Sequence, residues 1–405
     1  MNRKQLLNEA IRHLQVLCTD IGNRAVGSRG NRQATDYFRD QLRAHDWLVE
    51  ETPLEVMDWH SDGASLECGH ESFEVFSGPY SLGCSAEGEL AEASCVEEIE
   101  GTGLHGKILL LHGAVAAEQV MPKNFVFYNP EEHRRIIAAL EKSGVKALAC
   151  ATGRNAALAG GSYPFPLFED GDFDIPNVYM KDIEGARLLN CVGRSVRLES
   201  RARRIPETAF NVLGRKGDSG DRRLVISAHI DAKKGSPGAI DNATGVAVLL
   251  LLAGLLKDYL GHIPVELVAF NGEDYYAAPG QMKYLEQHQG RFDQVLLNIN
   301  IDGAGYKEGP SAFSPFGLDG AWQQAFDQVL QKHPTIIQGG PWYQGDHSIF
   351  LQAGRPAIAV ISAWFLEHLD TQDITHTPRD NPGIVEEERL VELALAIRDL
   401  VLWIH

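Results

Sequence analysis

The sequence predicts an α/β protein: a mixed, mostly parallel sheet flanked by helices, with a small β-rich domain inserted into it. Three apolar runs rich in β-branched residues, at 224–231, 265–274 and 295–302, are typical of buried strands in a parallel sheet. Segments of helical pattern lie between and around these runs. From about residue 58 to 203 the pattern changes to short strands and turns, which indicates a separate domain.

Length and composition indicate a soluble protein of two domains. A chain of 405 residues is too long for one compact core of ordinary size. Hydrophobic residues make up 44% and charged residues 23%, as in globular proteins. The formal net charge is -18, which argues against a nucleic-acid partner because phosphate binding needs clustered lysine and arginine.

The compartment predicted from the sequence is the cytoplasm. The first ten residues lead directly into an amphipathic helix and contain no apolar signal core. No run is long and apolar enough to cross a membrane, and the segment 246–256 is too short. The six cysteines are scattered without metal or redox spacing, so reduced thiols are the simplest account. Nothing in the sequence predicts an oligomeric state.

Hydrophobic periodicity predicts the outer elements of the main domain. Apolar residues at helical spacing predict helices over 3–18 and 32–45, and alternation predicts a strand over 48–57. Further strands are expected at 210–214 and 357–361. The remaining helices are expected at 242–260, 280–289, 319–332 and 386–404. The first of these is apolar on almost its whole surface, as expected for a helix on a buried sheet.

The inserted domain is assigned to residues 58–203, between residues 1–57 and 204–405 of the main domain. Its clearest elements are strands at 106–113, 145–151 and 173–180, and helices at 129–143 and 182–190. An insertion of this kind begins and ends on the surface of the other domain, where it is best tolerated.

Side chains able to bind metal ions follow the three central strands. His229 and Asp231 end the first apolar run. Glu273 and Asp274 end the second, and Asp302 ends the third. In open α/β sheets, ligands bind beyond the carboxyl ends of the strands, so these five side chains should meet at one edge.

Two further residues complete the candidate site. Asp241 opens the helix after the first strand, and His376 lies in a loop before Pro378. Each residue alone has an ordinary explanation, since aspartate often caps helices and loop histidines are most often structural. Within this group of seven residues, two histidines and three of the five carboxylates are enough for a two-metal site. They would supply one bridging carboxylate and two further ligands for each of two metal ions. Oxygen and nitrogen ligands without thiolate suit zinc, and manganese or cobalt would also fit.

The order of these motifs resembles peptidase family M28, a family of zinc exopeptidases with co-catalytic zinc. The resemblance rests on His229-Ile-Asp231, Asp241-Asn242-Ala-Thr-Gly245, Glu273-Asp274, Asp302, Asp346-His347 and His376-Thr377 before Asp380. In the insertion, Gly106-Lys107-Ile-Leu-Leu and Gly144-Val-Lys-Ala-Leu resemble a protease-associated domain. The resemblance covers nearly the whole chain and implies the zinc exopeptidase fold.

The resemblance implies which residues bind zinc. Asp241 would bridge two zinc ions. His229 and Asp302 would bind one ion, and Asp274 and His376 would bind the other. The family usually carries glutamate where this chain has Asp274, and the shorter side chain is expected to shift or weaken one metal position.

The resemblance also implies the catalytic roles. Glu273 would be the general base, and Asp231 would orient the ring of His229 through its second nitrogen. Thr375 stands where many relatives carry a tyrosine that stabilises the tetrahedral intermediate. Tyr343 and His347 are the candidates for that role in this chain.

The expected function is therefore that of a metal-dependent exopeptidase, with aminopeptidase as the first choice, which hydrolyses peptides with a dinuclear zinc-activated water. Carboxypeptidase and dipeptidase activities stay open as alternatives. Two other classes share the fold: a non-peptide amide hydrolase or glutaminyl cyclase-like acyltransferase, and a non-catalytic receptor-like relative. Cyclase sites resemble a version of this centre with a single metal ion, and receptor-like relatives have lost metal ligands. The complete set of metal ligands in this chain therefore favours the exopeptidase.

Overall fold

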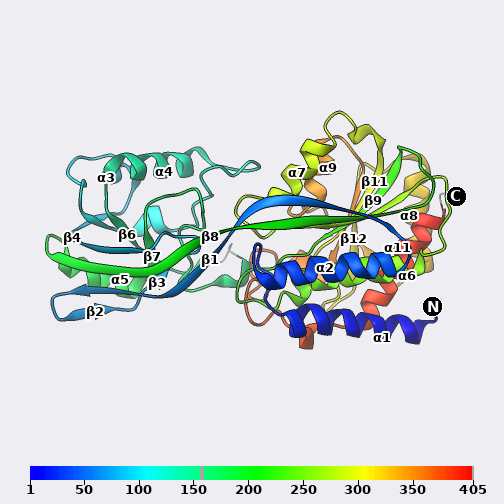
Figure 1. Cartoon of the computed structure of the whole chain (residues 1–405), viewed down its shortest axis with the longest axis horizontal. Coiled ribbons are helices and arrows are strands. Elements are labelled where there is room, and N and C mark those ends of the chain that lie inside the picture. The colour runs from blue at the N-terminus through cyan, green and yellow to red at the C-terminus, as the bar shows by residue number, and fades with distance from the viewer. Residues whose placement is uncertain (156–158, 404–405) are drawn as a thin grey trace. The chain divides into compact units, whose positions relative to one another are not determined.

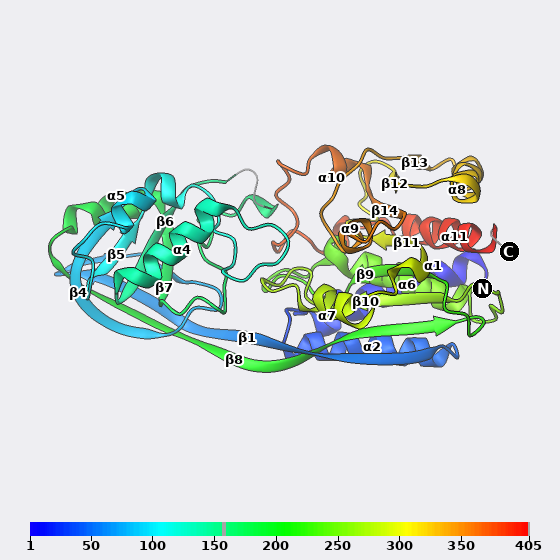
Figure 2. The ribbon, with the colours of Figure 1, turned by 90° about the horizontal axis from the view of Figure 1, so that it is seen from above.

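The computed structural model describes residues 1–155 and 159–403, and the chain forms two compact units. One unit comprises Met1–Val56 and Thr208–His405, and the other comprises Met57–Glu207. Each has its own strands and helices (Figures 1 and 2). Two long strands, β1 (Leu48–Cys68) and β8 (Ser195–Lys216), contribute residues to both units.

The sheet of the first unit has a parallel centre. Its strand order is β13-β12-β14-β11-β9-β10-β8. Strands β14, β11, β9 and β10 are parallel, whereas β12 is antiparallel to β14 and β8 is antiparallel to β10. The bounds are Arg223–His229 for β9, Val265–Phe270 for β10, Val295–Ile301 for β11, Ser311–Phe316 for β12, Ile336–Gln338 for β13 and Ala357–Ser362 for β14. The predicted mixed, mostly parallel sheet is confirmed.

Helices cover both faces of this sheet. Figure 1 shows α7 and α9 on one side and α1, α2 and α6 on the other. Residues Thr244 to Gly254 of α6 are all buried, because this helix contacts β9 on one side and α1, α2 and α11 on the others. The bounds are α1 Arg3–Leu14, η1 Gln15–Ile21, α2 Arg29–Ala44, η5 Ala239–Ala243, α6 Thr244–Leu255, α7 Pro279–Gln287, η6 Phe292–Gln294, α8 Gly320–Lys332, α9 His347–Gln352, α10 Ala363–Glu367, η7 Pro382–Ile384 and α11 Glu387–Trp403.

Side-chain caps set the starts of the first two helices. The side chain of Asn2 accepts a hydrogen bond from the backbone of Gln5, whose side chain accepts one from the backbone of Asn2. Ser28 caps α2 by accepting from the backbone N–H of Asn31 at 3.1 Å. Helix α2 therefore begins at Arg29, earlier than the periodicity of apolar residues predicts.

The second unit also has parallel strands at its centre. Its strand order is β8-β4-β5-β6-β7-β3, with β4 to β7 parallel and β8 and β3 antiparallel at the ends. Successive residues of β5, such as Ile108 and Leu109, belong to different apolar clusters. Because successive residues of a strand point to opposite faces, both faces of the sheet are covered. The bounds are β2 Glu71–Phe73, β3 Phe76–Ser77, β4 Cys84–Ala93, α3 Val96–Ile99, β5 Ile108–Leu111, η2 Gly113–Ala116, α4 Glu131–Ser143, β6 Ala147–Thr152, η3 Ala159–Gly161, β7 Asn177–Lys181, α5 Asp182–Leu188 and η4 Leu189–Cys191.

The sequence underestimates the two long strands. The strand expected at 48–57 continues to Cys68, and the strand expected at 210–214 is the end of one that begins at Ser195. Both strands have exposed or half-buried charged residues at many positions, so no continuous apolar run marks their length. Strands β4, β12 and β13 and helix α9 were not predicted.

Two predicted absences concern membranes and disulfides. Within residues 1–155 and 159–403, no helix combines the length and the apolar character that crossing a bilayer requires. All six cysteines are free thiols in the structure.

Candidate metal centre

The carboxyl ends of three adjacent parallel strands carry most of the candidate site. His229 is the last residue of β9, and Asp302 directly follows β11. Glu273 and Asp274 lie in the loop that follows β10. Strands β10 and β11 both pair with β9 in parallel register, so their ends lie side by side.

Asp241 lies between the two histidines. Its Oδ1 is 3.1 Å from Nε2 of His229, and its Oδ2 is 3.1 Å from Nε2 of His376. Oδ1 of Asp302 is 3.4 Å from the same nitrogen of His229, and Oδ1 of Asp274 is 2.8 Å from Nε2 of His376. Each histidine thus contacts Asp241 and one further carboxylate.

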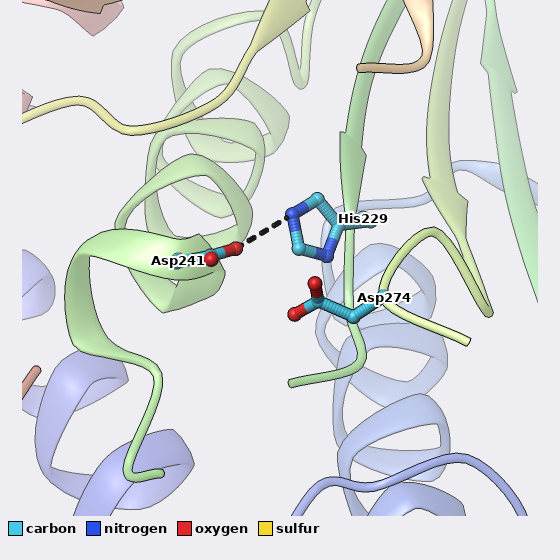
Figure 3. A group of neighbouring side chains, drawn as sticks. All are labelled: His229, Asp241 and Asp274. Atoms are coloured by element: carbon cyan, nitrogen blue, oxygen red, sulfur yellow. Dashed lines mark ion pairs between the residues drawn. The ribbon is translucent and has the colours of Figure 1, made fainter. Parts of the chain in front are cut away.

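The donor atoms at this site are suited to a divalent cation. One ligand atom each of His229, Asp241 and Asp274 lies within 4.8 Å of the other two (Figure 3). His229 is 1% exposed, and neither of its ring nitrogens has a hydrogen bond of good geometry within the described part of the chain. The same holds for Oδ2 of Asp274. Buried polar atoms normally have partners, and a bound ion would supply them here.

Burial shifts the charge states of the acids at the site. It raises the pKa of Glu273 well above the ordinary value, and the nearby Asp274 carboxylate adds to the shift. Burial also raises the pKa of Asp274, and the charge of Asp241 adds to it. Burial opposes ionisation of Asp241 too, but its contacts with His229 and His376 hold its pKa below the usual range. Such a cluster of buried carboxylates is stabilised by nearby positive charge.

Asp231 supports the loop that carries the two acids. Its carboxylate accepts hydrogen bonds from the backbone N–H groups of Gly272 at 2.7 Å, Glu273 at 3.3 Å and Asp274 at 3.1 Å. Its Oδ1 is 3.7 Å from Nδ1 of His229, which is longer than a hydrogen bond. The bond expected between Asp231 and the imidazole is therefore not formed, because both carboxylate oxygens are directed at the loop.

Asp380 holds Asp241 in place, a role that the sequence analysis did not assign. Its carboxylate accepts from the backbone N–H of Ile240 at 2.6 Å and from that of Asp241 at 3.1 Å. Burial and the charge of Asp241 raise the pKa of Asp380 to about 7. In the sequence, Asp380 is visible only as an acid four residues after His376. Its hydrogen-bond partners, Ile240 and Asp241, are far away in the chain.

The loop of His376 has an unusual backbone. His376 lies in the left-handed region at φ 62°, which few residues other than glycine adopt. Gln372 accepts from the backbone N–H groups of Ile374 and Thr375, and the Thr377 hydroxyl donates to the carbonyl of Ile374. These bonds hold a conformation that would otherwise be disfavoured.

The two candidates for stabilising the tetrahedral intermediate differ. His347 is buried, and its Nε2 donates to the carbonyl of Trp342 at 3.0 Å. Burial lowers the pKa of His347, and its Nδ1 has no hydrogen-bond partner within the described residues. Tyr343 is 66% exposed, and its ring contacts Phe316. Tyr343 and His347 therefore both stay predictions for this role.

A buried arginine braces the chain between His229 and Asp241. Arg24 is 0% exposed. Its guanidinium donates to four backbone carbonyls at 2.7 to 3.1 Å, those of Leu17, Ile230, Pro237 and Gly238. The last three residues lie in the segment that separates His229 from Asp241.

Replacing Arg24 with methionine should lower the free energy of unfolding by about 3 kcal/mol or more, because several buried carbonyls lose their donor. Urea unfolding of metal-free protein measures the change. Arg29→Met is the matched control, since Arg29 is exposed at the start of α2. An equal stability of the two variants would contradict this account of Arg24.

The fold is that of zinc aminopeptidases. An aminopeptidase from Aneurinibacillus sp. strain AM-1 superposes with a TM-score of 0.75 at 21% identity, covering 98% of this chain and 93% of that one. BSAP, a zinc aminopeptidase from Bacillus subtilis, superposes with a TM-score of 0.72 at 19% identity, covering 98% and 94%.

Residues 211–401 match the model of peptidase family M28. Aminopeptidase YwaD of Bacillus subtilis (strain 168) is 25% identical over 241 residues, which are 56% of this chain and only half of that protein's length. Carboxypeptidase Q of Xenopus laevis is 24% identical over 402 residues, 92% of this chain and 82% of that one. A glutaminyl-peptide cyclotransferase of Drosophila melanogaster is 24% identical over 230 residues, covering 46% and 63%. The relatives named here are thus two peptidases and one cyclotransferase.

Proposed function

We propose that the protein is a zinc-dependent exopeptidase of the aminopeptidase type with two zinc ions at the centre around Asp241. The observation that carries this proposal is the position of the Asp241 carboxylate, with one oxygen toward His229 and the other toward His376. A carboxylate in this position can be shared by two ions.

In this proposal each ion has its own pair of ligands besides Asp241. His229 and Asp302 would hold one ion, and Asp274 and His376 would hold the other. When bound, the ions polarise the peptide carbonyl and increase the acidity of water. All these residues belong to the unit formed by Met1–Val56 and Thr208–His405. The unit Met57–Glu207, which we interpret as protease-associated, supplies no ligand.

Glu273 acts as the proton carrier. Its carboxylate accepts the proton of the attacking water and passes it to the leaving amine. Asp231 supports this role by fixing the backbone of Glu273 and of both neighbouring residues. A fixed loop keeps the proton carrier beside the ions, and such positioning is a large part of catalysis.

The proposal is tested with a panel of aminoacyl chromogenic substrates. We expect hydrolysis of substrates with a free α-amine, none of their N-acetylated forms, and loss of activity on metal removal with 1,10-phenanthroline. Added zinc should restore activity. Parallel assays use a peptide with a free carboxyl but a blocked amine, free dipeptides, and a peptide with N-terminal glutamine.

Other outcomes of this panel would replace the proposal. Cleavage of the amine-blocked peptide would identify a carboxypeptidase, and cleavage of dipeptides alone would identify a dipeptidase. Ring closure of N-terminal glutamine without hydrolysis would identify a cyclase. Full activity after complete metal removal would contradict the metal-dependent mechanism itself.

A further inference from the structure

A second polar cavity lies in the same unit, at the opposite end of the central strands from the metal centre. Arg223, the first residue of β9, lines it, whereas His229 ends that strand about 20 Å away. Glu266 near the start of β10 also lines it, and Tyr284 and His288 close it from α7 and its C-terminal end. The cavity has a volume of about 440 Å³.

Two arginines and one glutamate meet at the inner part of this cavity. Arg223 is 3% exposed, and its Nε donates to Oε2 of Glu266 at 2.8 Å. Nη1 of Arg215 is 3.6 Å from Oε1 of the same glutamate, so two guanidinium groups share one buried carboxylate. His288 adds no charge, since burial lowers its pKa to about 4. The remaining charged residues of the lining are exposed: Glu50, Asp221 and Arg291. The lining as a whole therefore has three arginines and three carboxylates, and among the described residues the buried Arg223 is the arginine of the lining with an unpaired donor.

Two buried donors at the cavity lack an acceptor. Within the described part of the chain, neither Nη2 of Arg223 nor the hydroxyl of Tyr284 has a hydrogen-bond partner of good geometry. The hydroxyl lies beside the guanidinium and can accept from it, but its own proton still lacks an acceptor. The Tyr284 ring is held by stacking on His288 at 4.0 Å and by an edge contact with Phe270 at 5.2 Å. Both donors are therefore fixed in place.

We propose that this cavity is a binding site for a small organic carboxylate. A carboxylate has two acceptor oxygens, one for Nη2 of Arg223 and one for the Tyr284 hydroxyl, and its charge strengthens the hydrogen bond to the guanidinium group. Ordered water would satisfy the donors but carries no charge for the charge-assisted hydrogen bond that Arg223 can make. The volume is that of a site for a small molecule.

Calorimetric titration of the full chain with succinate tests the proposal, with succinamide as the uncharged probe of similar shape. Metals are first removed with 1,10-phenanthroline, because ions at the catalytic centre would themselves bind carboxylates. We expect succinate to bind at one site per chain and succinamide not to bind. Tyr284→Phe should weaken succinate binding about tenfold or more, since a hydrogen bond to a charged group is lost.

Two further variants complete the test. Arg215→Gln removes one of the two guanidinium groups beside Glu266 at a side chain that is 30% exposed, and the less positive site should also bind succinate more weakly. Tyr128→Phe, at a tyrosine that is 69% exposed in the other unit, is the matched control and should bind as the wild type does. Thermal unfolding verifies that each variant is folded.

Three results would overturn the proposal. These are no succinate binding by the metal-free wild type, binding only after zinc is restored, and wild-type affinity in either folded variant, Tyr284→Phe or Arg215→Gln. Equal binding of succinamide and succinate would overturn the requirement for a negative charge. None of these measurements depends on the peptidase activity.

Discussion

Glu273→Gln should lower kcat by about 10²- to 10⁴-fold, with KM and bound zinc little changed. Glutamine keeps the size of the side chain but cannot accept a proton from water. Glu273 is not one of the proposed ligands, and Asp231 anchors the loop through backbone N–H groups that the substitution leaves in place. The loss should therefore be confined to the chemical step.

Steady-state kinetics on the best substrate of the panel measures this effect, with zinc determined on the same samples. Glu367→Gln is the matched control, because Glu367 is exposed at the end of α10 and outside the site. An activity of Glu273→Gln close to that of the wild type would show that the proton carrier has been misassigned, whatever the metal content.

Asp241→Asn should abolish measurable activity and most of the zinc binding. In the proposed centre Asp241 is the shared ligand, so one substitution weakens both metal positions. An amide has one oxygen and no charge, whereas both carboxylate oxygens of Asp241 contact a histidine in the structure. Asp274→Asn should have a smaller effect on metal content, since Asp274 contacts only His376 of the two histidines.

Elemental analysis of zinc per chain distinguishes these two variants. We expect Asp241→Asn to retain little zinc and Asp274→Asn to retain about half of the wild-type content. Circular dichroism verifies that both remain folded, since loss of one partner of a buried charge cluster can destabilise a protein. Wild-type zinc content in Asp241→Asn would exclude a bridging role for this residue.

The strands that carry the site could be predicted because their signal is local. The buried residues of β9, β10 and β11 form continuous apolar runs, and a run of this kind indicates a strand covered on both faces. The polar residues directly after such runs can be read from the sequence, because they are neighbours of the strand in the chain. Strands β1 and β8 were underestimated because their alternating exposed residues give no such run.

Hydrogen-bond partners could not be predicted in the same way. The spacing of His229 and Asp231 predicts a local hydrogen bond between them, because residues two apart in an extended chain point the same way. In the folded protein the Asp231 carboxylate instead accepts from N–H groups about forty residues later, at Gly272 and beyond. Donors from different strands compete for the same carboxylate, and the folded structure decides which of them bind it. The sequence of one segment carries no information about donors elsewhere in the chain.

The sequence by itself determined the central strands and the acids and histidines that follow them, because strand pattern and residue order are properties of short segments. Only the tertiary structure decided how Asp241 lies between two histidines, how Asp380 holds it, and how Arg24 braces the connecting segment. Arg24 and Ile230 are 206 positions apart, and Asp380 and Asp241 are 139 apart. Contacts across such separations arise from the packing of whole elements, which local sequence patterns do not specify.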